Sequence, residues 1–335
     1  MNGELRVLFP QIKTENTFVF ETRLFTSKDR LILAPMQDLT DYRFRNAYDR
    51  LFPNSIDRAV TPFISITHGN LSFGKRKYRD VIKENNSSKM EIIPQVMGND
   101  IEGMVRIAEV LLSMGYSEMN WNLGCPFERT LKKDRGAGLL KDTSRIERII
   151  EDVVSRTTIN LSLKLRLGVE DKADIYRLIP IINALPIKNI IIHPRLAIDK
   201  YDAKVDLDCF EDILSKVNKR VVYNGDIFSK EDFNKLKLRF PTINDWMIGR
   251  GILFNPLLPF EIKSIEYFNK SKSVLALHSE LLKTCSSVNK MKEYWSYFSQ
   301  GLNIEEDKLS IIYSCETLEE LDEKVRDIIK EMIKE

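Results

Sequence analysis

The amino-acid sequence predicts a (β/α)₈ barrel, the TIM-barrel fold, followed by a C-terminal helical domain. Short apolar runs rich in β-branched residues recur at regular intervals, and segments with a helical period separate them. Strands that alternate with helices pair in parallel through right-handed crossovers, and eight such units close a barrel. After Pro259 the strand signals stop, and the chain becomes helical in pattern and rich in Lys and Glu. An open doubly wound sheet is the alternative, but the count of eight and the polar residues at the strand ends favour the barrel.

Each element follows from its hydrophobic period. The expected strands are apolar runs at residues 31–36, 58–64, 91–97, 119–124, 161–167, 189–194, 221–226 and 245–250. The clearest helical segments between them are 101–114, 144–154, 171–185, 208–217 and 230–238.

Three parts of the chain follow from this order of elements. Residues 1–30 form an N-terminal extension, in which the alternation over 17–25 allows a short strand or hairpin. The barrel occupies residues 31–260, and the helical domain occupies residues 261–335.

The composition excludes several classes of protein. Since no run of eighteen apolar residues is present, we expect no membrane span. The N-terminus has no signal-peptide pattern, so the cytoplasm is the expected compartment. The four cysteines are far apart and only three histidines are present, so we expect neither a metal site nor disulfides. With a net charge of +2, a nucleic-acid site would require local basic clusters.

Residues suited to chemistry gather where the expected strands end, which is the active-site face of a TIM barrel. Taken singly, most have a structural explanation, because a lone Cys or His is more often a buried core residue. Lys164 is harder to explain in this way, because it lies between Leu163 and Leu165 and would be costly inside a barrel without an anion. Together they predict one convergent site. They are Pro35, Met36, Gln95, Asn122, Cys125, Lys164, Arg166, His193, Arg195, Asn224, Gly225, Asp226, Gly249 and Arg250.

The last two strand ends indicate a phosphate site. Residues 224–226 (NGD) and 249–251 (GRG) supply glycine backbones, and Arg250 adds a guanidinium that can bind phosphate with two hydrogen bonds. Loops after strands seven and eight of TIM barrels commonly bind phosphate. This arrangement suits the 5′-phosphate of flavin mononucleotide (FMN).

At this point the chain resembles the tRNA-dihydrouridine synthases. The most specific match is 122–140 (NLGCPFERTLKKDRGAGLL), which is similar to the catalytic signature of that family. Other family motifs occur in the family's order at 33–45 (LAPMQDLTDYRFR), 164–168 (KLRLG), 193–201 (HPRLAIDKY), 224–227 (NGDI) and 247–251 (MIGRG). In the helical domain, 290–298 (KMKEYWSYF) resembles a segment of the bacterial enzymes. The chain departs from the family pattern at Pro62, where many members carry Glu, and at Gln37, Asp38, Pro194 and Leu196. None of these departures removes Cys125 or the phosphate site.

The resemblance implies roles for the residues at the strand ends. Pro35, Met36, Gln95, Lys164 and His193 would contact the flavin ring, while Asn224, Gly225, Asp226, Gly249 and Arg250 would hold its ribityl chain and phosphate. Asn122, Arg166 and Arg195 would contact the substrate.

The reaction that the resemblance implies is reductive. NADPH (or NADH) reduces FMN and leaves, the reduced FMN passes a hydride from N5 to C6 of a uracil, and Cys125 donates a proton to C5 as general acid.

The resemblance also implies tRNA as partner, with the uridine, expected in the D-loop, turned out of the RNA fold. The basic residues Lys132, Lys133 and Arg135 flank the cysteine loop, and Lys290 and Lys292 lie in the helical domain, which we expect to bind tRNA. A monomer is expected.

Two alternatives stay open. One is an FMN-dependent barrel oxidoreductase acting on a small molecule such as a free pyrimidine, and the other is a non-catalytic RNA-binding protein. The sequence also leaves open which uridine is reduced and whether ribosomal RNA is the target.

Overall fold

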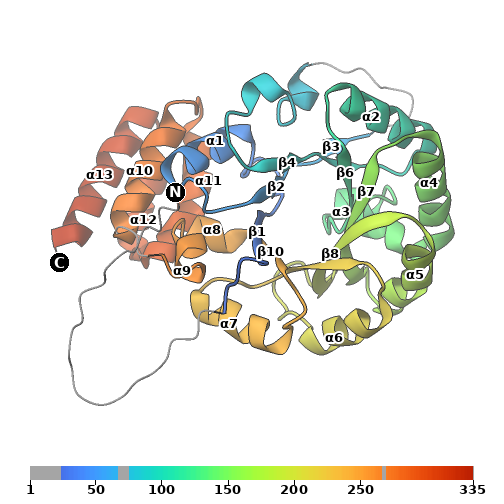
Figure 1. Ribbon diagram of the computed structural model, residues 1–335. Coiled ribbons are helices and arrows are strands. Elements are labelled where there is room, and N and C mark those ends of the chain that lie inside the picture. The colour runs from blue at the N-terminus through green and yellow to red at the C-terminus, as the bar shows by residue number, and fades with distance from the viewer. Residues whose placement is uncertain (1–23, 67–74, 266–268, 335) are drawn as a thin grey trace, which may run out of the picture.

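The computed structural model describes residues 24–66, 75–265 and 269–334, and it shows a ring of parallel strands surrounded by helices (Figure 1). The possible strand or hairpin at 17–25 lies almost wholly outside the described residues. All strand pairs within the described residues are parallel, as the alternation of strands and helices predicts. The strands are β1 (Arg30–Leu33), β2 (Arg58–Val60), β3 (Ile64–Ser65), β4 (Glu91–Ile93), β5 (Gln95–Met97), β6 (Glu118–Leu123), β7 (Asn160–Gly168), β8 (Ile187–Leu196), β9 (Arg220–Asn224) and β10 (Asp245–Ile248).

The ten strands form the eight-stranded barrel that the sequence predicts, because two barrel strands are each divided by a proline. Pro62 separates β2 from β3 and Pro94 separates β4 from β5, since proline has no N–H to add to a ladder. β2 pairs with β4 and β3 pairs with β5, so the second and third barrel strands meet on both sides of the interruption and close the ring. Between them, Thr61 N–H donates to Ile93 O over 3.0 Å, and the Thr61 hydroxyl accepts from Gln95 N–H over 3.0 Å.

Helices form the outer layer of the barrel (Figure 1), and the five that the sequence predicts agree with their expected bounds to within two residues. Most begin at an Asp or Ser whose side chain accepts hydrogen bonds from the first free N–H groups, as at Asp100, Asp142 and Ser229. The barrel helices are α1 (Tyr42–Leu51), α2 (Ile101–Ser113), α3 (Glu128–Leu131), α4 (Thr143–Arg156), α5 (Ala173–Ala184), α6 (Leu207–Lys216), α7 (Lys230–Arg239), α8 (Arg250–Phe254) and α9 (Leu258–Ile262).

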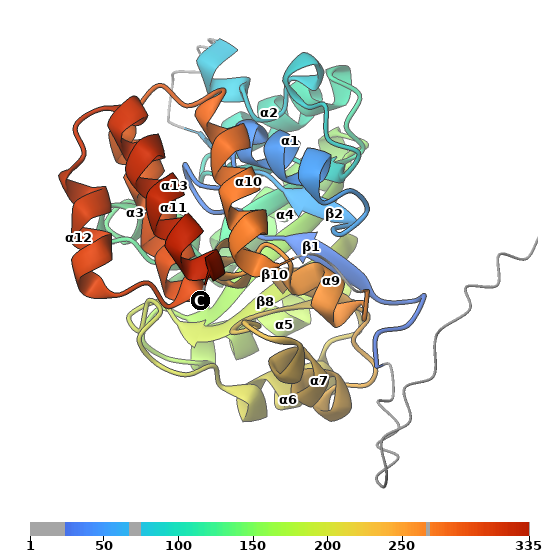
Figure 2. The ribbon, with the colours of Figure 1, turned by 90° about the vertical axis from the view of Figure 1, so that its left-hand side faces the viewer.

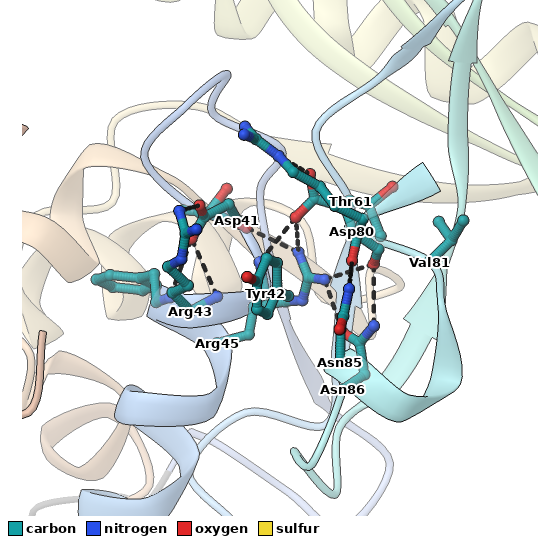
Figure 3. Close-up of polar contacts among 12 residues, drawn as sticks. Asp41, Tyr42, Arg43, Arg45, Thr61, Asp80, Val81, Asn85 and Asn86 are labelled. Carbon is teal, nitrogen blue, oxygen red and sulfur yellow. Dashed lines mark hydrogen bonds and ion pairs between the residues drawn. The ribbon is translucent and has the colours of Figure 1, made fainter. Parts of the chain in front are cut away.

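The described part of the segment before β4, residues 75–90, is attached to α1 by hydrogen bonds. It contains the 3₁₀ turns η1 (Lys75–Tyr78) and η2 (Lys83–Asn85). The buried Arg45 guanidinium donates to Thr40 O over 2.8 Å, to Asp80 O over 2.7 Å and to the Asn86 side chain over 2.7 Å (Figure 3). The Asp80 carboxylate accepts from Tyr42 N–H over 2.7 Å. This network fixes the first turn of α1 and with it the loop that leads from β1 to that helix.

The C-terminal region is helical, as predicted. It consists of α10 (Lys270–Leu282), α11 (Val288–Leu302), α12 (Glu306–Ser314) and α13 (Leu318–Lys334). α10 packs beside α1 of the barrel (Figure 2) and α11 packs against α8, while α12 and α13 pack on the other helices of the region. α11 approaches the end of α8 so closely that a Cβ on Gly301 would lie 1.6 Å from Phe254 O. The Tyr294 hydroxyl also donates to Leu39 O over 2.8 Å. None of the helices in the described part of the chain is long and apolar enough to cross a membrane.

Candidate active site

Two adjoining cavities open where the barrel strands end. We call them the glycine cavity, lined by Gly225, Gly249 and Gly251, and the cysteine cavity, lined by Cys125 and measuring ≈ 470 Å³. The two cavities share a set of lining residues, so they form one continuous site. The shared residues are Pro35, Met36, Lys164, His193, Tyr201 and Arg250.

The glycine cavity has a positively charged wall built around Arg250. This arginine follows Gly249 at the start of α8, and its guanidinium donates to the Asp226 carboxylate over 3.1 Å and lies 4.7 Å from the centre of the Tyr201 ring. Asp226 also pairs with the buried Arg195. A Cβ on Gly225 would lie 2.8 Å from Val205 Cγ1, so a side chain at this position would displace the neighbouring loop. One carboxylate therefore holds two guanidinium groups beside a cavity with little room for side chains.

Lys164 and His193 contribute titratable groups to both cavities, and both lie in a strongly positive environment. Burial first, and then the charge of Arg166, lower the pKa of Lys164 from its ordinary 10.5 to about 7. None of the described residues supplies a carboxylate partner for Lys164 within ion-pair distance. Burial and four neighbouring cations hold the pKa of His193 well below its usual value, and its Nε2 lies 2.9 Å from Arg195 Nη1. The His193 ring is therefore neutral near pH 7, so it accepts a hydrogen bond from Arg195.

Cys125 is 8% exposed and lies at the start of a tightly held loop. The side-chain oxygen of Asn122 accepts from the N–H groups of Gly124 and Cys125, both over 3.0 Å. The Cys125 thiol donates a hydrogen bond to the Thr130 hydroxyl over 3.5 Å. Gly136 packs against the cysteine with a φ of +53°, and a Cβ there would lie 2.8 Å from Cys125 Cβ. The segment around the thiol is thus fixed at both ends.

Most of the residues that the sequence predicts for the site line these cavities. Arg166 does so while donating to Gly124 O over 3.0 Å and to Leu196 O over 2.8 Å. The residues brought together are Pro35, Met36, Asn122, Cys125, Lys164, Arg166, His193, Asn224, Gly225, Asp226, Gly249 and Arg250.

Other predicted residues lie outside the cavity walls. Gln95 is fully buried inside the barrel. Lys132 and Lys133 are exposed just after α3, where Lys132 pairs with Glu128, but Arg135 beside them is only 9% exposed.

In the helical region, Lys290 lines a separate hollow with Arg43 and Arg79. Lys292 lines neither cavity and is half-buried on α11.

The helical region contributes a wall to the cysteine cavity that the sequence pattern did not predict. Glu293, Ser296, Tyr297 and Gln300 line it from α11. Their spacing of three, four and seven residues is the signal that could have predicted a common helical face. Aromatic residues complete the lining and were also missed; they are Phe63, Phe127, Tyr201 and Phe254.

Comparison with known proteins adds the family. The model of the family described as dihydrouridine synthase (Dus) matches residues 32–334. The chain is 30% identical over 244 residues to the tRNA-dihydrouridine(16) synthase of Neisseria meningitidis serogroup B, covering 71% of this chain and 72% of that protein. It is 28% identical over 242 residues to tRNA-dihydrouridine synthase B of Pseudomonas putida, covering 71% and 69% of the two chains.

A likeness to solved structures supports the barrel fold. Morphinone reductase in complex with tetrahydroNAD superposes with a TM-score of 0.51 at 10% identity, over 70% of this chain and 86% of that one. At this identity the likeness shows the fold alone. The family model, by contrast, spans both the barrel and the helical region. The chain therefore belongs to the dihydrouridine synthase family, whose members are flavin-dependent oxidoreductases that use NAD(P)H.

Proposed function

We propose that this protein reduces the C5–C6 double bond of a uridine in tRNA to 5,6-dihydrouridine, with FMN as its flavin and NADPH as the reductant. The observation that carries the proposal is that Cys125 shares one continuous site with Lys164, His193 and the glycine cavity. The family match and the two relatives named as tRNA-dihydrouridine synthases support it.

The glycine cavity fits a flavin mononucleotide in its chemistry. Arg250 provides a guanidinium for one phosphate, and the backbones of Gly225 and Gly249 leave room for a ligand to approach. Lys164, which lacks a carboxylate partner among the described residues, fits the electron-rich edge of a flavin ring. We assign the ring to Pro35, Met36, Lys164 and His193, and the ribityl chain and phosphate to Asn224, Gly225, Gly249 and Arg250. When bound, the flavin would supply the hydride for C6 of the uracil.

Asp226 and Arg195 receive a different role from the one that the resemblance implies. A carboxylate repels phosphate, whereas Asp226 accepts from both Arg195 and Arg250. Arg195 also donates to Ala203 O over 2.5 Å, which leaves its guanidinium engaged on several sides. We therefore propose that Arg195 and Asp226 orient Arg250 toward the phosphate. Gln95 also departs from the role that the resemblance implies, because it is fully buried and does not line the glycine cavity.

We assign the role of general acid to Cys125. Its Sγ–H bond breaks as the proton forms a bond with C5, and sulfur keeps the electron pair. The positive charges of Lys164 and Arg166 lie near this sulfur and stabilise the thiolate that results. Asn122 and Arg166 are the polar groups of the cysteine cavity that can bind the uracil.

The exposed Lys132 and Lys133 remain our candidates for contacts with RNA phosphates near the cavity. Arg135 is too buried for such a contact. Lys290 and Lys292 would reach only RNA that extends over the helical region, outside the cysteine cavity. A cytoplasmic location and a monomeric state stay predictions from the sequence.

The proposal is tested with purified protein, NADPH and tRNA that lacks the modification. Wild type should form dihydrouridine, and Cys125→Ala should lose about 10²- to 10⁴-fold in rate while it keeps the flavin absorbance. Reduction of free uridine at a comparable rate would favour the small-molecule alternative. A protein that binds tRNA but purifies without flavin would favour the non-catalytic alternative.

A further inference from the structure

The interior of the barrel is divided into an apolar and a polar part. β1, β2, β4, β8, β9 and β10 each contribute one residue to an apolar cluster, which includes Ile32, Val60 and Val222. From β5, β6 and β7 the inward side chains at one level are Gln95, Asn120 and Ser162. The register places these three side by side, because Gln95 pairs with Asn120 and Asn120 pairs with Ser162. Asn122 lies two residues further along β6, toward the cysteine loop.

These four residues form one chain of hydrogen bonds, which we call the amide relay (Ser162, Asn120, Gln95 and Asn122). The Asn122 side-chain N–H donates to Gln95 over 2.9 Å, and the Gln95 side-chain N–H donates to Asn120 over 2.8 Å. The Asn120 side-chain N–H donates to the Ser162 hydroxyl over 3.0 Å. All four residues are at most 8% exposed, so each depends on these neighbours for its hydrogen bonds.

The amide relay has a single direction, which is set at both of its ends. At the upper end the Asn122 oxygen accepts from Gly124 and Cys125 N–H, so its amide nitrogen must point toward Gln95. At the lower end the Ser162 hydroxyl donates to Met119 O over 3.4 Å, so its oxygen must accept from Asn120. Each amide therefore has only one orientation that satisfies both neighbours. The amide relay thus connects the Ser162 hydroxyl with the N–H of Cys125.

We propose that Ser162, Asn120 and Gln95 are positioning residues, which hold the Cys125 backbone through Asn122 so that its thiol stays aimed into the cysteine cavity. This inference rests on the proposed function for the role of the thiol, but the placement of the thiol can be measured without it. Ser162 is the most useful member, because it lines neither cavity and, among the described residues, its hydroxyl is connected to Cys125 through the amide relay.

The test compares Ser162→Ala with Ser162→Thr, which restores a hydroxyl, and with Ser299→Ala as a matched control. Ser299 is also buried, but its hydroxyl has no hydrogen-bond partner within the described residues. The first readout is the alkylation rate of Cys125 in flavin-free protein, followed by mass spectrometry of its peptide across pH 6 to 9. The second readout is kcat and KM for tRNA reduction.

Ser162→Ala should raise the alkylation rate about fivefold or more, because a loosened loop exposes the thiol, and it should lower kcat about tenfold with little change in KM. Ser162→Thr should return both values toward those of wild type, and Ser299→Ala should change neither.

If Ser162→Ala leaves the alkylation rate and kcat within twofold of wild type, the proposal is wrong. If Ser162→Ala fails to fold, Asn120→Asp is judged by the same criteria, because it replaces the amide group that donates to Ser162 with a carboxylate oxygen that accepts. If wild type reduces no tRNA, the alkylation arm still decides about the amide relay.

Discussion

Gly136 illustrates how single backbone positions decide the geometry at Cys125. Its positive φ and the 2.8 Å separation between a hypothetical Cβ and Cys125 Cβ leave room for no larger residue. The sequence shows this glycine within the catalytic signature but cannot show what it touches. For the same reason it could predict Cys125, Lys164 and Arg250 from residue type, but not that Asn122 and Gln95 would be tied to each other. Those hydrogen bonds depend on the register between β5 and β6, which the sequence pattern does not give.

Gly136→Ala should therefore lower the rate of dihydrouridine formation in tRNA by about 10²-fold while the flavin stays bound. The reason is that the new methyl group displaces the thiol by a fraction of an ångström or more. The matched control is Gly115→Ala. Gly115 also has a positive φ, but its Cβ would meet only the flexible end of Lys83. Both variants should lose about 1 kcal/mol in free energy of unfolding from backbone strain. Equal activities of the two variants would contradict the argument.

Lys164 should destabilise the flavin-free protein at neutral and lower pH. Its pKa of about 7 in the folded state lies below its ordinary value, so below pH 7 the folded chain carries a buried charge at full cost. As pH rises from 7 to 10 the folded lysine is neutral while the unfolded one is still charged, so the free energy of unfolding rises. Lys164→Met should therefore stabilise the protein by about 3 kcal/mol at pH 6, and the gain should shrink toward pH 10. Thermal unfolding of both proteins across this range provides the check, and a gain independent of pH would rule the explanation out.

At the scale of elements, the hydrophobic period predicts the eight barrel strands and five of their helices well, because each has one buried face. It does not predict the divided second and third strands, since Pro62 and Pro94 act through a missing N–H and not through hydrophobicity. It also does not show which face of α11 lines the cysteine cavity. Both faces of that helix are used, one for packing through Tyr294 and Trp295 and one for the cavity through Tyr297 and Gln300.

His278 joins three helices of the C-terminal region and should make it sensitive to acid. Its ring accepts from Trp295 Nε1 on α11 over 3.1 Å and donates to Asp322 on α13 over 3.2 Å. Burial lowers the pKa of His278 from 6.5 to about 4, so the folded ring stays neutral while the unfolded one takes up a proton below pH 6.5. About 3 kcal/mol of stability should be lost between pH 6.5 and 4 for this reason.

The variant His278→Gln isolates this contribution. It should be less stable than wild type at pH 7 but should lose less stability between pH 6.5 and 4, as measured by urea unfolding at each pH. A variant that follows the wild-type pH dependence in parallel would show that His278 is not the responsible group.

At the scale of the whole molecule, the helical region completes the active-site cavity. Residues of α11 line the cysteine cavity, and the contact of Gly301 with Phe254 O brings α11 against α8. The sequence predicts a helical region after the barrel, but the contact between them depends on the absence of a side chain at one position. A break in the pattern of elements cannot reveal such a contact.

Gly301→Ala should separate α11 from α8, because a methyl group 1.6 Å from a carbonyl oxygen cannot be accommodated without movement of the backbone. We expect a loss of about 2 to 3 kcal/mol in free energy of unfolding and a rise in KM for tRNA, while flavin binding in the glycine cavity is retained. Ser310→Ala, on the exposed surface of α12, serves as the control for effects of substitution in this region. If the variant lost both flavin binding and RNA binding, the whole barrel would depend on this contact.

The unequal interior of the barrel has a consequence for how the sequence can vary. Apolar side chains such as Ile32, Val60 and Val222 belong to one buried cluster, so exchanges among Ile, Leu, Val and Met that conserve total volume should be tolerated there. Asn120 and Gln95 allow no such exchange, because each must donate and accept in one direction. A saturation scan should therefore show permissive positions in the apolar cluster and restrictive positions in the amide relay.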